Sequence, residues 1–236
     1  MKNSQGRIRR WVGVKFVRRA PSRSGRYVDL RVSRMRPEHA IWWQSHVQPI
    51  IDDMPDRADH GWNWLVHVPF TTLAGKVLRQ RPAGFTVGIV GEDPDAPFVP
   101  CIMVQLLGRF RLRAKSVRRS AYLWYLSSAP EEALLDIPDH PMTPKTVPKR
   151  LGTIGLDVAV THSFNRGRRG RVALYADEEG GTQLMEWYHK RGMETLSPGQ
   201  RLPRGIRRLV KPSDGRYCYY TDQGALEASV ALDDLR

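Results

Sequence analysis

A change of hydrophobic period near Arg150 constrains the fold more than any other feature. Before it, β-rich apolar runs follow one another at 85–90, 98–107 and 121–130. After it, apolar and small residues recur on one helix face: Leu151, Ile154, Gly155, Val158, Ala159 and His162. A further strand is predicted at 170–177. The successive strands predict antiparallel pairing, and the strand–helix–strand step permits a parallel crossover, so we expect an α/β or α+β fold.

Other patterns supply the remaining elements. We expect a strand at 26–35, a helix that starts at Pro37 and ends or bends at Pro49, and a helix that runs to Arg81. A strand at 216–222 and a short terminal helix follow near the end. The segment 131–148 holds four prolines and is predicted to be an ordered loop. Together these elements predict a mixed, mostly antiparallel central sheet with helices on both faces.

The basic charge is concentrated at the start of the chain. Lys and Arg total 38 against 24 Asp and Glu, and residues 1–26 hold nine of the basic residues and no acid. We therefore divide the chain into a basic N-terminal arm, 1–26, and a single domain, 27–236. Such an arm attracts polyanions such as nucleic acid, but it also has the composition of a transit peptide or a solvated tail. Within it, 11–17 alternates and predicts an edge strand.

Several classes of protein are disfavoured by composition. No apolar run approaches the roughly 18 residues that span a membrane, and no signal segment opens the sequence. Cys101 and Cys218 are the only cysteines and form no CxxC pair, so a disulfide scaffold or a structural zinc site is not expected. We expect a cytoplasmic protein without a metal.

Two short stretches carry candidate chemistry. In "PKRLGTIGLDVAV", Lys149, Arg150, Gly152 and Thr153 stand at a helix start, where free backbone N–H groups and the helix dipole favour an anion. A solvated basic turn gives the same pattern, and no Walker or GxGxxG motif is present. In "GGTQLMEWYHKRGMETL", Thr182 can cap a helix that Gly192 ends, and Tyr188 lies near its end. Tyr188 is either a core aromatic residue or a proton donor.

The order of five segments is similar to that of the GNAT superfamily, the acyl-coenzyme A-dependent N-acyltransferases. The segments are "YLWYLSSAP", "KRLGTI", "LDVAVTHSF", "RVALYAD" and "EWYHKRGM", within about residues 121–196. Gly152 matches the glycine of the family's [R/Q]xxGx[G/A] turn, and Tyr188 matches its motif tyrosine. The chain departs from the pattern at Lys149, where the family has Arg or Gln, at Ile154, where it has Gly or Ala, and at Gly181, where it often has Asn.

The resemblance implies a GNAT-like fold, acetyl-coenzyme A as the acyl donor, and roles for particular residues. Leu126, Ser127 and Ser128 would contact the pantetheine arm, and the turn would bind the pyrophosphate through Lys149, Arg150, Leu151, Gly152 and Thr153. Tyr188 would protonate the leaving thiolate. The base is not determined. Glu131 could act through water, although Glu131 and Glu132 are more typical of a solvated helix start.

The sequence leaves two functions open. One is an N-acetyltransferase whose acceptor is a small amine, a protein amino group or an aminoacyl-RNA. The other is a catalytically inactive GNAT-fold module that binds nucleic acid or ribonucleoprotein through the basic arm, which the departures at Ile154 and Gly181 favour. The oligomeric state is also open, with a homodimer as one candidate.

Overall fold

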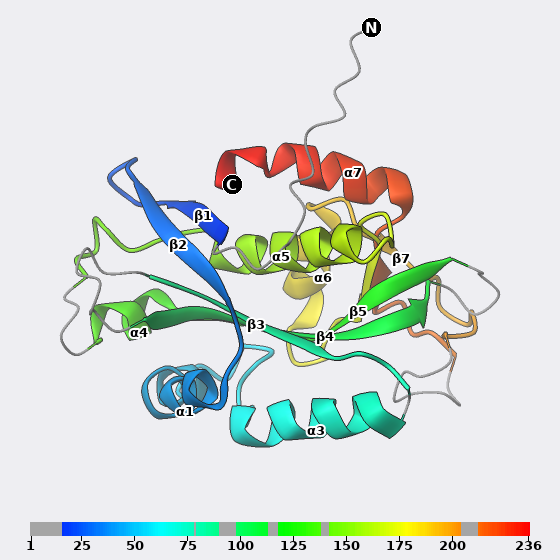
Figure 1. The fold of residues 1–236 in the computed structure, drawn as a ribbon, viewed down its shortest axis with the longest axis horizontal. Helices are drawn as coiled ribbons and strands as arrows, with labels where there is room; N and C mark the ends of the chain where they lie inside the picture. Colours follow the sequence, from blue (N-terminus) through cyan, green and yellow to red (C-terminus); the bar gives the residue numbers. More distant parts are fainter. Residues whose placement is uncertain (1–15, 78, 90–97, 113–117, 138–141, 204–211) are drawn as a thin grey trace, which may run out of the picture.

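The computed structural model describes residues 16–77, 79–89, 98–112, 118–137, 142–203 and 212–236, which form one eight-stranded sheet (Figure 1). The strands are β1 (Phe16–Pro21), β2 (Tyr27–Arg34), β3 (Ala83–Ile89), β4 (Val99–Arg111), β5 (Arg119–Ser128), β6 (Val172–Tyr175), β7 (Glu194–Thr195) and β8 (Tyr217–Tyr219). The helices are α1 (Pro37–His46), α2 (Gln48–Asp52), α3 (Trp64–Val77), α4 (Glu131–Leu135), α5 (Leu151–Asn165), α6 (Gly181–His189) and α7 (Asp222–Ala231).

The strand order is β1-β2-β3-β4-β5-β6-β8-β7. From β1 to β5 each strand pairs antiparallel with the next one along the chain. The pairing of β5 with β6 is parallel and spans only Ala121–Leu123 against Val172–Leu174. The chain makes this crossover through α5, as the strand–helix–strand pattern predicts. The prediction of a mixed, mostly antiparallel sheet is confirmed.

Helices cover both faces of the sheet, also as predicted. In Figure 1, α5 and α7 lie on one face, and α1 and α3 lie on the other. The helix α5 is almost entirely buried, and most of its own buried residues are small or apolar. On the opposite face Trp43 and Trp64 are fully buried, as expected of core aromatic residues.

Several boundaries differ from the sequence predictions. Five residues of the predicted loop form α4, and α3 ends at Val77 rather than at Arg81. The prediction that Thr182 caps this helix is wrong, because α6 already begins at Gly181 and has no side-chain cap. Gly192 follows α6 with a φ of +79°, which is the left-handed conformation that glycine favours after a helix.

The start of the described chain is part of the sheet. The edge strand expected at 11–17 begins at Phe16 and runs to Pro21, and residues 11–15 lie outside the described part of the chain. Arg18 of β1 forms an ion pair with Asp157 of α5, with 3.0 Å between Nε and Oδ2, and Arg236 pairs with the same carboxylate. Asp157 is completely buried, so one carboxylate holds together the first strand, the central helix and the last residue.

Across the described ranges, none of the helices combines the length and the apolar character that crossing a membrane requires.

Candidate functional site

The last five residues of β5 have an open edge. On one side β5 pairs with β4 as far as Ser128, which lies opposite Ile102. On the other side the parallel pairing with β6 stops at Leu123, and no described strand continues it. Along residues 124–128 no described strand therefore lies beside this edge of β5, and an extended ligand can bind there as a strand would.

The N-terminus of α5 lies beside this open edge. A Cβ atom placed on Gly152 would lie 3.8 Å from Ser128 Oγ. The Ile154 N–H donates to the Arg150 carbonyl at 3.0 Å, but no described residue accepts a hydrogen bond from the N–H groups of 151–153. These groups and the positive end of the helix dipole form the kind of surface that binds phosphate.

The basic residues of the turn are placed differently from one another. Lys149 is exposed, and its backbone N–H donates to the Pro21 carbonyl at 2.8 Å. Arg150 has a φ of 61°, a left-handed conformation that is unusual without glycine. Its guanidinium donates to Asp234 at 2.7 Å. Lys149 thus forms no ion pair with a described residue, whereas Arg150 pairs with Asp234 near the end of the chain.

Trp187 of α6 and Arg191, which lies just beyond the end of α6, cover the turn at 149–153. A Cβ atom on Gly152 would lie 3.2 Å from the Trp187 ring, so only glycine fits there without a shift. Arg191 donates from Nε to Thr153 Oγ1 at 3.0 Å, and its guanidinium lies 3.6 Å from the centroid of the Trp187 ring. The sequence predictions missed both residues, although they stand one turn apart in the segment that contains Tyr188.

Tyr188 lies on the same helix but is buried, with 8% of its surface exposed. Burial is the main cause that raises the pKa of its phenol, and the nearby Cys218 adds to the increase. No described residue hydrogen-bonds to its hydroxyl group. Because its pKa is raised, the phenol keeps its proton. No hydrogen bond joins Tyr188 to the described residues 126–128.

Residues 126–128 face in alternate directions, as strand geometry requires. Leu126 packs beneath Gly155 of α5, where an added Cβ atom would overlap its methyl group. Ser127 points to the opposite face and donates to Asp59 Oδ2 at 2.5 Å. Arg57 donates to both oxygens of Asp59, at 2.8 and 2.7 Å, and to the Ser128 carbonyl at 2.8 Å.

The pair Arg57 and Asp59 therefore anchors the end of β5. Asp59 is 5% exposed, and the ion pair with Arg57 compensates for its burial. No local pattern in the sequence marks this pair, because it lies in an irregular segment ahead of α3 and reaches β5 only in the folded chain. Next to it, the His67 ring stacks on Tyr125 with 4.2 Å between centroids, and burial lowers the pKa of the imidazole.

Glu131 starts α4, three residues beyond Ser128. Its Oε2 accepts a hydrogen bond from Arg23 at 2.8 Å, and both side chains are partly exposed. Exposed ion pairs of this kind contribute at most about 1 kcal/mol to the unfolding free energy. Arg23 therefore orients the Glu131 carboxylate but leaves it accessible to solvent. Among the residues that the structure describes, there is no cluster of His, Cys, Asp and Glu that could hold a metal ion.

The open edge of β5 and the helix that begins beside it are consistent with the GNAT-like fold that the sequence resemblance implies. Solved structures with this fold resemble the chain. Mycobacterium smegmatis RimJ, solved in complex with CoA-disulfide, matches with a TM-score of 0.51 over 94% of this chain and 95% of that chain, at 13% identity. The prediction of a GNAT-like fold is confirmed.

Two further structures match less closely. A GNAT-family acetyltransferase from Staphylococcus aureus Mu50 has a TM-score of 0.47 and 9% identity, over 80% of this chain and 97% of that chain. The Vibrio cholerae spermidine N-acetyltransferase, in complex with CoA and spermine, has a TM-score of 0.46 and 11% identity, over 84% and 98% of the two chains. No protein-family model matches the sequence, and no curated protein matches it.

Proposed function

We propose that the chain is an N-acyltransferase that moves an acetyl group from acetyl-coenzyme A to an amine by direct attack in a ternary complex. One observation carries the proposal: the open edge of β5 at 124–128 meets the N-terminus of α5 at Gly152. A donor with a diphosphate at one end and an extended amide arm fits both features at once, because the helix supplies N–H groups and the strand supplies a free edge.

The binding roles follow from this geometry. The N–H groups of Leu151, Gly152 and Thr153 would bind the diphosphate, with Lys149 adding positive charge. The backbone of Leu126–Ser128 would hydrogen-bond to the pantetheine arm and bring the thioester to the end of β5. Arg150 would hold the turn in place through Asp234 rather than bind the donor directly.

The chemistry requires two proton transfers. The amine nitrogen attacks the thioester carbon, a C–N bond forms, the C–S bond breaks and the thiolate leaves. Tyr188, which keeps its proton because burial raises its pKa, would donate that proton to the sulfur. Glu131 would take a proton from the ammonium form of the acceptor through a water molecule before the neutral amine attacks, with Arg23 fixing the carboxylate near the strand end.

Calorimetry with acetyl-coenzyme A tests the donor site. We expect saturable micromolar binding by the wild-type chain, loss of binding in Gly152→Glu, and unchanged binding in Gln200→Glu. The last variant adds the same charge at an exposed position. Absence of binding by the wild type up to millimolar donor would refute the proposal that the chain is an enzyme. The alternative of a catalytically inactive module that binds nucleic acid would then remain.

Thiol release in the presence of a panel of amines then tests the chemistry. Tyr188→Phe should lower kcat by roughly 100-fold with donor affinity unchanged, since only the proton donor is lost. A variant with full activity would show that Tyr188 is a core residue.

A further inference from the structure

A second concave site lies at the other end of α5. It is a cavity of about 310 Å³, and five arginines and a histidine contribute to its lining: Arg81, Arg119, His162, Arg166, Arg168 and Arg171. Since α5 has 15 residues and rises about 1.5 Å per residue, roughly 20 Å separates this cavity from the turn at Gly152. The inference below does not rest on the proposed function.

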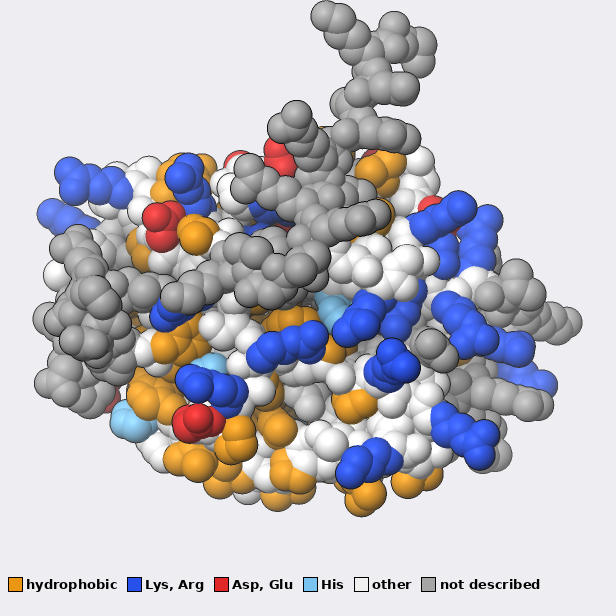
Figure 2. All heavy atoms as spheres, in the orientation of Figure 1, with side chains coloured by type: hydrophobic (Ala, Val, Ile, Leu, Met, Phe, Trp, Pro, Cys, Tyr) orange, Lys and Arg blue, Asp and Glu red, His pale blue; other side chains and the backbone are white. Residues whose placement is uncertain are grey.

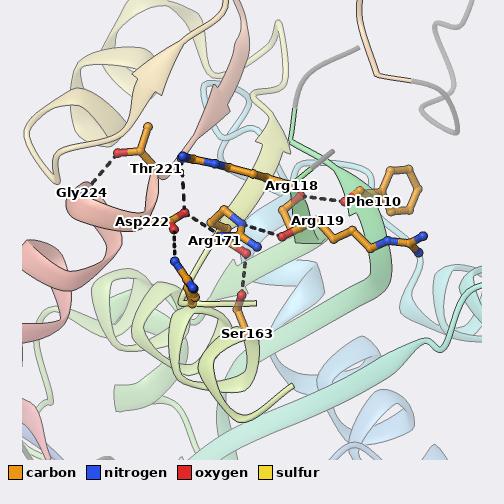
Figure 3. Close-up of polar contacts among 10 residues, drawn as sticks. Phe110, Arg118, Arg119, Ser163, Arg171, Thr221, Asp222 and Gly224 are labelled. Carbon is orange, nitrogen blue, oxygen red and sulfur yellow. Dashed lines mark hydrogen bonds and ion pairs between the residues drawn. The ribbon is translucent and has the colours of Figure 1, made fainter. Parts of the chain in front are cut away.

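The fold fixes the arginines at the floor of the cavity. Arg171 donates from Nε to the Arg119 carbonyl at 2.7 Å, and its own carbonyl accepts from Ser163 Oγ at 2.6 Å. Arg168 and Arg171 are each 8% exposed. Figure 3 shows the side chains of Arg118 and Arg171 reaching toward Asp222, whereas the side chain of Arg119 extends away from it. The buried side chains of Arg168 and Arg171 are held in place before any ligand arrives.

Positive charge at the cavity far exceeds the negative charge. Asp222 pairs with Arg171 at 2.7 Å, with Arg169 at 3.4 Å and with Arg118 at 3.8 Å, so one carboxylate serves three guanidinium groups. No described carboxylate forms an ion pair with the exposed rim residues Arg81, Arg119 and Arg166. The C-terminal end of α5 contributes only about half a negative charge, which does not balance these cations.

The titration of neighbouring groups reflects the same excess. Burial, followed by the charges of Arg168, Arg166 and Arg34, lowers the pKa of His162 to about 3. Burial alone would raise the pKa of Asp222, but the hydrogen bond and the charge of Arg171 outweigh it and the pKa is lowered. The imidazole is therefore neutral at physiological pH, and the carboxylate is ionised.

The positive surface extends beyond the cavity. Arg111 lies opposite Arg119 in the β4–β5 ladder, and Arg34 is close enough to Arg166 that its own pKa is lowered by burial and by that charge. Figure 2 shows Lys and Arg side chains spread across the middle and right of this face. A single small anion would use only the cavity, whereas a chain of phosphates would use the cavity and its surroundings.

We propose that this arginine cavity binds the phosphodiester backbone of a single-stranded nucleic acid, with one phosphate in the cavity and its neighbours on the rim. Guanidinium groups match phosphate with two parallel N–H donors, and several arginines along a groove follow a phosphate backbone without reading bases. RNA and DNA share this chemistry. No residue that lines the cavity belongs to the basic N-terminal arm (1–26), so the cavity is a second candidate for polyanion binding.

Fluorescence anisotropy with a fluorescein-labelled 12-nucleotide single-stranded RNA tests the proposal on the full chain. The cavity variant is Arg81→Gln/Arg119→Gln/Arg166→Gln, in which all three side chains are exposed, so the fold should survive. The control is Lys145→Gln/Lys190→Gln/Arg201→Gln, which removes the same charge from exposed sites elsewhere. Because both variants keep the whole N-terminal arm, the comparison isolates the cavity.

We expect the cavity variant to bind at least about tenfold more weakly. Its slope of log affinity against log salt should fall by about 2, which is three contacts at roughly 0.7 each. The control should change by less than twofold. Equal weakening of both variants would overturn the proposal, as would displacement of the RNA by poly-glutamate at the same charge concentration. Binding of pyrophosphate with no binding of RNA would also overturn it in favour of a small-anion site.

The cavity variant should bind acetyl-coenzyme A as the wild type does, because the two sites lie at opposite ends of α5. Joint loss of RNA and donor binding would place both ligands in the arginine cavity and overturn the assignment of two sites. Failure of donor binding alone would affect only the proposed function.

Discussion

Replacing Asp157 with Asn should destabilise the protein more than any exposed charge removal. Asp157 is fully buried, and Arg18, its partner in β1, is 3% exposed. The substitution leaves the Arg18 guanidinium buried without a counter-charge, and Arg236 loses the same partner. Removing one member of a buried ion pair costs about 3–5 kcal/mol. For a domain of this size that corresponds to a fall in melting temperature of roughly 6–20 °C.

Urea denaturation followed by circular dichroism measures the change in unfolding free energy. Asp29→Asn is the matched control, because Asp29 pairs with Arg19 at 3.5 Å and both side chains are more than half exposed. The control should lose less than about 1 kcal/mol. The double variant Arg18→Met/Asp157→Leu should recover most of the loss, since an apolar pair of similar volume often replaces a buried ion pair without cost. A loss below about 1 kcal/mol in Asp157→Asn, or no recovery in the double variant, would refute this account of the buried charge.

Three further outcomes are expected. Gly155→Ala would overlap a leucine methyl group of β5, so overpacking should lower the unfolding free energy by about 1–3 kcal/mol in denaturant titration, and an unchanged midpoint would contradict the packing. Burial raises the pKa of the Cys101 and Cys218 thiols to about 12, so these groups ionise only in the unfolded chain as pH rises above about 9. Stability should therefore fall by about 1.4 kcal/mol per thiol per pH unit there, and replacing both cysteines with Ala should flatten the profile. Ser127→Ala removes a donor from the buried Asp59 carboxylate and should cost about 1–3 kcal/mol, whereas a neutral result would show that the 2.5 Å hydrogen bond is dispensable.

Local patterns predicted the sheet and the long helix because those elements depend on neighbours in sequence. The apolar face of 151–162 is needed to bury α5, and its period is therefore visible in the chain. The five-residue α4 lacks such a period, since it is too short to show one. In the absence of such a period, the four prolines of 131–148 led to the prediction of a loop.

The candidate site was predictable only in part. Gly152 stands out because a close approach to the backbone at a helix N-terminus requires glycine. The pairing of Arg57 with Asp59 and the Ser128 carbonyl joins segments about 70 residues apart, and nothing near either segment specifies it. The arginine cavity likewise collects residues from several elements, each of which looks like an ordinary surface cation in the sequence. Tertiary juxtaposition of this kind has no local signature.

The short seam between β5 and β6 has a consequence for folding. The strands β3, β4 and β5 pair through short connections, whereas β2 reaches β3 only after a connection as long as the crossover, with Arg34 opposite Phe85. The strands β6, β7 and β8 join β5 through only Ala121–Leu123 and Val172–Leu174, after a crossover of about 50 residues. Loops of that length close slowly, so we expect β3, β4 and β5 to assemble before the seam and before the β2–β3 pairing. The open edge beside Gly152 would then form late during folding, and a ligand that bridges it would slow its loss during unfolding.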